Sequence, residues 1–189
     1  MKKILILMMA SGLAACNVPS NETKGASMEI KVEAKAALDQ GIAEYQRKNY
    51  TAAFPFFQQA EQLGHMKAAR YIGLMYLNGY GVSKDLTEAT AAFSRAAEKG
   101  DITAQYWLGW SYENGNGVPR DYAKARYWYE QSAMRGDIIA APAITALGRM
   151  YENGIGVAAD KQKAVAYYRQ AAAVGEEQAK KALERLGTP

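Results

Sequence analysis

The chain has 189 residues, of which 49% are hydrophobic and 22% charged, a composition typical of a globular protein rather than a disordered one. Its 23 basic residues stand against 19 acidic residues, which gives a formal charge of +4. The basic residues form no block of the length that a phosphate-tracking surface needs, so we expect no nucleic-acid partner.

The first residues have the pattern of an export signal. Residues 1–3 (Met-Lys-Lys) are positively charged, and residues 4–13 are apolar but too few to span a bilayer as a mature helix. The run Leu-Ala-Ala-Cys follows and ends at Cys16, the only cysteine in the chain. This run resembles the lipobox of bacterial lipoproteins, which implies cleavage after residue 15 and lipidation of Cys16. The alternative is that Cys16 merely ends an ordinary secretory or membrane-spanning segment.

The lipoprotein resemblance also implies a cellular address. Removing residues 1–15 lowers the formal charge from +4 to +2, because it deletes Lys2 and Lys3 but no acid. One acyl chain holds a protein only marginally, at ~0.8 kcal/mol per buried methylene, whereas the three chains of a bacterial lipoprotein anchor it stably. Residue 17 is Asn rather than the aspartate that favours inner-membrane retention. The resemblance therefore implies the outer membrane of the cell envelope, on its periplasmic side.

The segment after Cys16 is polar at first and becomes periodic later. Residues 17–31 have no helical spacing and carry turn formers early on, so we expect a flexible tether over residues 16–31. From Val32 the apolar spacing predicts an N-terminal helix over residues 32–48. The next helix contains Pro55 about one turn inside its start, where the missing amide predicts a local kink.

One short run organises the rest of the chain. Tyr-x-Asn-Gly-x-Gly-Val occurs at residues 76–82, 112–118 and 151–157. This spacing predicts one supersecondary unit stacked several times, within a folded domain over residues 32–189. Each unit is expected to be a pair of antiparallel helices that bury their apolar stripes only against the neighbouring pair. The predicted units are residues 50–85, 86–121 and 122–160, followed by a C-terminal cap over 161–186.

Positions that repeat between units predict the core. The first helix of each unit carries a small residue, a large aromatic and a small residue at helical spacing, and the second helix carries a glycine. The third unit is three residues longer, and Pro142 falls where its second helix should continue, which predicts an interruption. The columns are Ala53, Ala89, Ala125 and Ala164; Phe57, Phe93, Tyr129 and Tyr168; Ala60, Ala96, Ser132 and Ala171; and Gly73, Gly109 and Gly148.

These motifs resemble the Sel-1-like repeat family, which is related to the tetratricopeptide repeats. The resemblance covers roughly residues 50–186 and implies an all-α fold, a right-handed α/α superhelical solenoid of helix-turn-helix repeats with a concave binding surface. The motifs that carry it are Ala-Ala-Glu-Lys-Gly at 96–100, Ala-Gln-Tyr-Trp-Leu-Gly at 104–109, Tyr-Glu-Asn-Gly at 112–115 and Gly-Val-Pro-Arg-Asp at 117–121.

The glycine-containing loops predict helix ends. Phosphate-binding loops follow a strand and open a helix, whereas these runs follow a helix. We expect the first glycine of each run to end its helix with positive φ, and we interpret the residue between the two glycines as free to vary. Helix-capping aspartates are predicted at Asp85, Asp121 and Asp160.

Catalytic and metal chemistry find little support in the sequence. His65, the only histidine, occupies the column of Asp101, Asp137 and Glu176 just before a helix, where such residues satisfy free amides. No serine or cysteine is placed by a motif to act as a nucleophile, and one histidine without a free cysteine does not make a zinc site. We therefore predict no enzyme, no catalytic residue, no cofactor and no metal.

Aromatic and arginine side chains in variable columns are the candidate partner contacts. Columns that differ between units should face a partner, because packing does not dictate their residues. Trp, Tyr and Arg contribute most of the binding energy at protein interfaces, which selects Trp110, Arg126, Tyr127 and Trp128. Trp128 lies in a mostly aromatic column, so a core position is an equal alternative for it.

The family resemblance leaves two functions open. The first is a membrane-anchored periplasmic scaffold or adaptor that binds a protein or peptide on its concave face. The alternative is an immunity protein that neutralises a periplasm-delivered toxin such as a phospholipase effector. An enzyme, for instance a β-lactam hydrolase as suggested for cysteine-rich relatives, ranks third. The sequence leaves the oligomeric state open.

Overall fold

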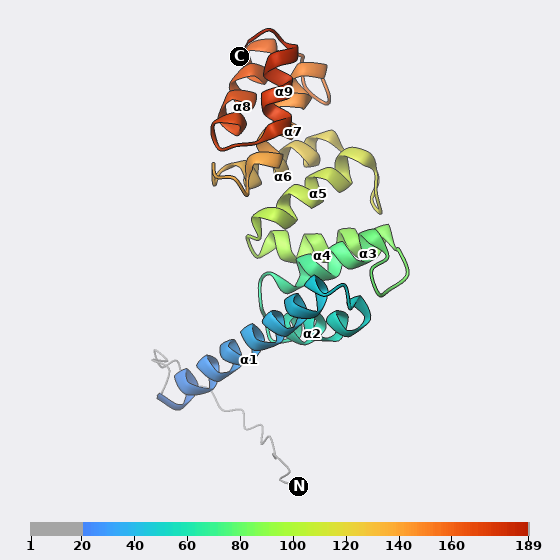
Figure 1. Cartoon of the computed structure of the whole chain (residues 1–189), viewed down its shortest axis with the longest axis vertical. Coiled ribbons are helices and arrows are strands. Elements are labelled where there is room, and N and C mark those ends of the chain that lie inside the picture. The colour runs from blue at the N-terminus through green and yellow to red at the C-terminus, as the bar shows by residue number, and fades with distance from the viewer. Residues whose placement is uncertain (1–20, 189) are drawn as a thin grey trace, which may run out of the picture.

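The computed structural model describes residues 21–188, which form nine α-helices and no strand. The helices stack along one axis, from α1 at one end to α9 at the other, as a right-handed α/α solenoid (Figure 1). The helices are α1 Asn21–Gln46, α2 Tyr50–Gln62, α3 Ala68–Asn78, α4 Leu86–Glu98, α5 Ile102–Asn114, α6 Tyr122–Ala133, α7 Ala141–Asn153, α8 Lys161–Ala173 and α9 Glu177–Arg185.

Each odd-numbered helix from α1 to α7 packs tightly against the even-numbered helix that follows it. A glycine in the odd helix lies directly against an aromatic ring of the even helix, so that a Cβ at the glycine would overlap the ring. The closest Cβ-to-ring distances would be 2.7 Å for Gly41–Phe57, 2.5 Å for Gly73–Phe93, 2.7 Å for Gly109–Tyr129 and 2.7 Å for Gly148–Tyr168. The intimate pairs are therefore α1–α2, α3–α4, α5–α6 and α7–α8, whereas the units expected from sequence joined an even helix to the next odd one.

The predicted core columns are confirmed. Every residue of the two small-residue columns and of the aromatic column is at most 2% exposed. Small side chains let the helices approach closely, and the aromatic ring between them fills the remaining space. The four buried clusters follow one another along the stack, each joining consecutive helices, so the core is continuous only through contacts between neighbouring units.

The predicted helix ends are also confirmed. Gly79, Gly115 and Gly154 close α3, α5 and α7 with φ of 70°, 70° and 68°. At the following helices, the side chains of Asp85, Asp121 and Asp160 accept hydrogen bonds from first-turn amides. Both features satisfy backbone groups that a helix terminus leaves without partners.

The second glycine of each loop has a different role, because it contacts the preceding unit. A Cβ at Gly117 would lie 2.1 Å from the carbonyl oxygen of Leu86 at the start of α4. The residue between the glycines also packs there: the Tyr80 ring stacks on Tyr50, with centroids 4.3 Å apart. Our interpretation of this middle position as unconstrained was therefore wrong for Tyr80, which is fixed by the unit before it.

Helix α1 is longer than expected. It begins at Asn21, so residues 21–31 are helical where we predicted a flexible tether, and it ends at Gln46. Residues 25–33 are exposed, and this half of α1 projects away from the stack (Figure 1). The segment is rich in glutamate and lysine, which favour helices even without packing. The thirteen residues from 21 to 33 extend ~20 Å at 1.5 Å per residue.

Pro55 and Pro142, the two prolines considered above, have different effects on their helices. Helix α2 continues through Pro55 without a break. Our prediction that Pro142 interrupts a helix was wrong: it lies in the first turn of α7, where its missing amide costs no hydrogen bond. The extra residues of the third unit form the turn over residues 137–140 instead.

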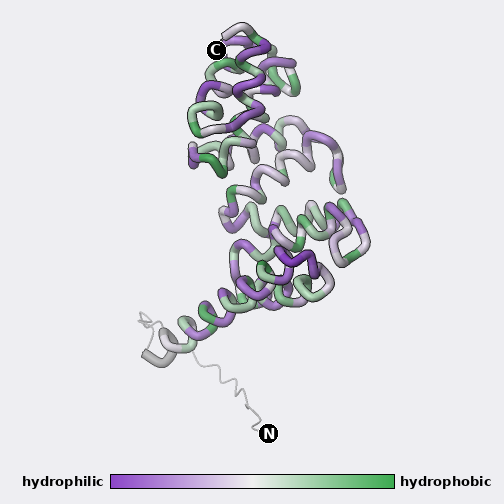
Figure 2. Tube along the Cα trace, in the orientation of Figure 1, coloured by the Kyte–Doolittle hydropathy of each residue, from purple (hydrophilic) through white to green (hydrophobic). Residues whose placement is uncertain are grey.

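Hydrophobic and hydrophilic residues alternate along the helices, as expected when each helix buries one stripe (Figure 2). Within residues 21–188, no helix combines the length and the apolar character that crossing a membrane requires. The predicted signal peptide and Cys16 lie outside the described residues.

Candidate functional site

The odd-numbered helices share one side of the stack, which we call the odd-helix face. Arg70, Tyr106, Thr145 and Lys181 occupy equivalent positions on α3, α5, α7 and α9, and each of them lines a cleft on this face. The C-terminal cleft has a volume of roughly 500 Å³ and lies where α5, α7 and α9 come together, with Tyr168 of α8 behind it. Its lining residues are Tyr106, Pro142, Thr145, Ala146, Arg149, Glu152, Asn153, Tyr168, Gln178, Lys181, Ala182 and Arg185.

A buried carboxylate joins three helices beside this cleft. The side chain of Glu113, at the end of α5, is only 6% exposed. The Tyr129 hydroxyl donates to its Oε2 at 2.7 Å, and two guanidinium nitrogens of Arg149 each lie 2.6 Å from one of its oxygens. Glu113 thus has the partners that a buried charge requires, and they come from the paired helix α6 and from α7 of the next unit.

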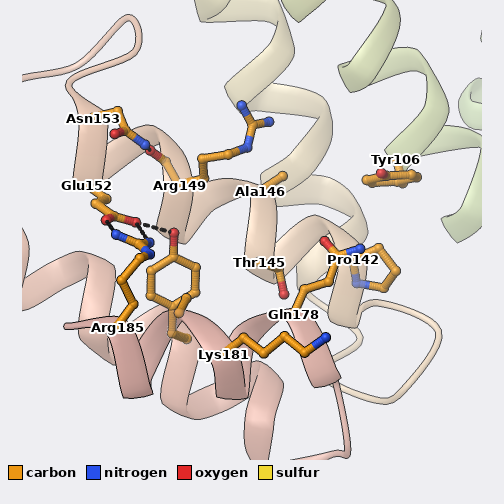
Figure 3. A pocket seen from close by; sticks show the side chains of 12 residues that line it. Tyr106, Pro142, Thr145, Ala146, Arg149, Glu152, Asn153, Gln178, Lys181 and Arg185 are labelled. Atoms are coloured by element: carbon orange, nitrogen blue, oxygen red, sulfur yellow. Dashed lines mark hydrogen bonds and ion pairs between the residues drawn. The ribbon is translucent and has the colours of Figure 1, made fainter. Parts of the chain in front are cut away.

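The same arrangement recurs one unit further along. The Tyr168 hydroxyl donates to Oε2 of Glu152 at 2.7 Å, and two guanidinium nitrogens of Arg185 donate to the Glu152 oxygens at 2.5 and 2.9 Å. Dashed lines mark these contacts in Figure 3. Two consecutive units therefore present a guanidinium held by a carboxylate, which is itself held by a tyrosine.

The electrostatics follow from these contacts. Hydrogen bonds from Arg185 lower the pKa of Glu152, and the Tyr168 hydroxyl lowers it further. Burial raises the pKa of Tyr129, and its carboxylate acceptor adds to this; Tyr168 shifts in the same direction for the same reasons. Both phenols therefore stay protonated at neutral pH and act as hydrogen-bond donors to the carboxylates.

The sequence carried a signal for this arrangement that we did not use. Where Glu113 and Tyr129 stand in the later unit, the earlier unit has Leu77 and Phe93, so carboxylate and hydroxyl appear or disappear together. Two columns that change in concert indicate a direct contact. Arg149 belongs to a variable column that we attributed to partner binding, but its contact with Glu113 shows that packing between units also sets it.

Both arginines keep hydrogen-bonding capacity for a ligand. A guanidinium has five N–H donors, and the fork onto each carboxylate uses two of them. The side chains of Arg149 and Arg185 are 44% and 59% exposed. Lys181 is also exposed and forms no ion pair among the described residues. Arg149 and Lys181 border the cleft at opposite edges, with Thr145 and Ala146 between them (Figure 3).

The arrangement can bind oxygen-rich groups in fixed positions. The two guanidinium groups lie one repeat apart and are oriented before any ligand arrives. Tyr106, Pro142 and Ala146 add apolar surface to the same cleft. Fixed donors beside apolar surface are what an extended peptide with acceptor side chains needs.

The structure does not bring the four predicted partner residues onto one surface. Trp110 lies on the odd-helix face of α5, at the position of Arg149 on α7; it is half-buried and packs edge-on against Trp107 with centroids 5.5 Å apart. Trp128 is half-buried and packs against the core cluster of α3, α4 and α5, which favours the core alternative.

Arg126 and Tyr127 lie on the even-numbered helix α6. Arg126 forms an ion pair with Glu130 at 3.5 Å, and Tyr127 is 51% exposed with its ring edge-on to Trp128. None of the four residues lines the C-terminal cleft, so this patch and the cleft are separate candidates.

His65 has the local role predicted for it. Its Nδ1 accepts a hydrogen bond from the Lys67 amide at 3.2 Å, as Asp101 accepts one from the Ala104 amide at 2.8 Å. Among the described residues, no three His, Cys, Asp or Glu side chains gather as a potential metal site.

Comparison with known proteins gives a consistent result. A family model described as the Sel1 repeat matches residues 34–65, 67–101, 102–137 and 141–176, which are the pairs α1–α2, α3–α4, α5–α6 and α7–α8. No curated protein matches the sequence.

Two solved structures are similar over most of the chain. One is a protective antigen of uropathogenic Escherichia coli with an SLR fold, at 33% identity and a TM-score of 0.73 over 86% of this chain and 35% of that one. The other is a Sel1 repeat protein from Oxalobacter formigenes, at 32% identity and a TM-score of 0.68 over 75% of this chain and 57% of that one. The chain thus spans about a third and just over half of these two relatives.

Proposed function

Because the chain belongs to the Sel1 repeat family, we propose that it is an envelope-anchored scaffold that holds a segment of a partner protein in its C-terminal cleft. Sel1 repeat proteins generally mediate interactions between proteins. The stacked helix pairs provide a long surface of exposed side chains on a rigid core, and such a surface is suited to binding a partner protein.

The pair of oriented guanidinium groups is the observation that supports this site. Arg149 and Arg185 are held by Glu113 and Glu152, so binding does not have to order them first. Preorganised donors improve affinity because less conformational entropy is lost on binding. Together with Lys181 they favour a partner segment with carboxylate or carbonyl acceptors.

The proposed anchor is a lipid on Cys16. Its support is the sequence pattern around that residue and the projecting half of α1, which would hold the cleft away from a membrane surface. Replacement Cys16→Ala should release the protein from the membrane fraction, measured by fractionating cells and labelling with a radioactive fatty acid. Unchanged membrane association of the unlabelled variant would contradict the anchor.

A photo-crosslinking amino acid tests the binding site directly. We would place it at residue 181, in the C-terminal cleft, and in a second variant at residue 161, an exposed lysine at the start of α8 outside the cleft. A defined adduct at 181 but not at 161, identified by mass spectrometry of the full-length protein from cells, would support the proposal. Adducts at both positions or at 161 alone would contradict it.

The identity of the crosslinked protein separates the two roles left open by the sequence. An envelope-assembly protein would support the adaptor role. A secreted phospholipase would instead favour the immunity role, which a toxin-protection assay with the Lys181→Glu variant would then test.

A further inference from the structure

A second cleft lies at the other end of the odd-helix face. This N-terminal cleft has a volume of roughly 570 Å³ and lies between α1 and α3, closed at one end by the turn that joins α2 to α3. No residue of the C-terminal cleft takes part in it.

The floor of the N-terminal cleft is apolar and largely rigid. Leu38 is buried, Ile42 is packed against the same core cluster, and the ring of Tyr71 stacks on Phe57 with centroids 4.7 Å apart. Met66 in the closing turn is 40% exposed. Its flexible thioether can adjust to an apolar group placed on this floor.

The rim of the cleft is cationic. Arg70 lies 3.6 Å from the buried carboxylate of Asp101, and Lys35 pairs with Asp39. The two remaining lysines are exposed and form no ion pair within the part of the chain whose side chains are described. The four rim cations therefore outnumber the two nearby carboxylates, and they are Lys31, Lys35, Lys67 and Arg70.

The closing turn differs from its counterparts in the same chain. The later turns have Asp101, Asp137 and Glu176 at the position of His65, so this turn alone replaces a negative charge by an imidazole. Burial, with Lys67 nearby, lowers the pKa of His65, so the ring is neutral at pH 7. Its Nδ1 accepts from the Lys67 amide, which leaves Nε2 as a hydrogen-bond donor.

We propose that the N-terminal cleft binds an acidic peptide segment that carries one apolar side chain. The apolar residue would cover Leu38 and Met66, and flanking carboxylates would pair with Lys31 and Lys67. The excess of positive charge on the rim complements carboxylates on either side of one apolar side chain that lies on the floor. The inference rests on the scaffold function proposed above and adds a second segment of stated chemistry.

The test uses the full chain and a fluorescein-labelled peptide of glutamates around one central leucine. Charge reversal at the two exposed lysines, Lys31→Glu with Lys67→Glu, should raise the Kd measured by fluorescence anisotropy at least about tenfold. The matched control is Lys99→Glu with Lys161→Glu, which changes the net charge equally at exposed positions outside both clefts. Equal losses in both double variants, or no loss in either, would overturn the proposal.

Two further measurements separate the contributions of charge and apolar contact. A peptide with glutamines in place of the glutamates should lose binding, and retained affinity would overturn the charge argument. Met66→Gln should weaken the leucine peptide about threefold to tenfold while leaving a peptide with a central alanine unchanged. An equal effect on both peptides would overturn the apolar contact.

Two more experiments distinguish peptide binding from lipid binding and distinguish the N-terminal cleft from the C-terminal cleft. Vesicles that contain phosphatidylglycerol test whether the cleft binds a lipid surface instead. If the protein binds these vesicles through Lys31 and Lys67 but does not bind the peptide, the peptide proposal is wrong. Crosslinking at residue 181 should be unchanged in the Lys31→Glu, Lys67→Glu variant, because that residue lies in the other cleft. The two sites can therefore fail independently of each other.

Discussion

The contact between Glu113 and Tyr129 can be replaced by the apolar pair that another unit of the same chain has at these positions. The preceding unit has Leu77 and Phe93 at these positions and forms the same helix pair. We predict that Glu113→Leu alone costs about 2–3 kcal/mol, because it leaves the fully buried Tyr129 hydroxyl without an acceptor. Tyr129→Phe alone should cost about 1–2 kcal/mol, since Arg149 still neutralises the carboxylate.

The double variant, Glu113→Leu with Tyr129→Phe, tests whether the two side chains interact directly. With both polar groups replaced, the site resembles the apolar version of the preceding unit, so the loss should be about 2 kcal/mol smaller than the sum of the single losses. Urea unfolding followed by tryptophan fluorescence and by circular dichroism gives the four free energies, provided that the two signals change together. Additivity within about 0.5 kcal/mol would refute a direct contact. The equivalent cycle on Glu152 and Tyr168 is the internal control.

Three further predictions test other features. Gly117→Ala should destabilise by about 1–3 kcal/mol more than Gly115→Ala in urea unfolding, because both have φ of 70° but only the Cβ at Gly117 overlaps a backbone oxygen; equal losses would contradict the loop contact. The stability contributed by Glu152, whose folded pKa is lowered, is complete above the unfolded value of 4.5 and is lost as pH falls through the folded pKa. Glu152→Gln should therefore flatten the acid side of a stability-against-pH curve, and an unchanged slope would argue against the ion pair. Tyr127→Ala should change stability by less than about 0.5 kcal/mol and leave crosslinking at residue 181 intact; lost crosslinking would return the partner site to α6.

Features that depend on local chemistry were predictable from the sequence. The glycine that ends α5 and the aspartate that begins α6 act through hydrogen bonds within a few residues of themselves. The buried columns follow from the repeat, because a side chain that recurs at helical spacing in every unit has to meet the same neighbours each time. The handedness of the superhelix was expected from the resemblance to Sel-1-like repeats.

The bounds of α1 and the place of Pro142 differ from the sequence-based expectations for two different reasons. The glutamates and lysines before Val32 carry no apolar period, yet they favour helix strongly enough to continue α1 outward to Asn21. Pro142 was expected inside a helix because the extra residues of that unit could not be placed in advance. They form a turn, and the proline then starts α7 at a position that tolerates it.

The candidate site was the least predictable feature, for a related reason. Arg149 varies between units, and variation by itself does not distinguish a residue that meets a partner from one that meets another unit. Its contact with Glu113 joins residues 36 positions apart, which only the stacked structure brings together. The same stacking left Trp110 and Trp128 half-buried, whereas Tyr127 is exposed on α6.

By itself the sequence determined the repeating helices, their glycine and aspartate caps, the core columns and the family, because each of these arises from short-range or strictly periodic interactions. The tertiary structure decided which polar residues pair across units, where the odd helices leave two clefts, and which cations border them. Those outcomes depend on the distances between helices of neighbouring units, and a periodic pattern alone does not specify these distances.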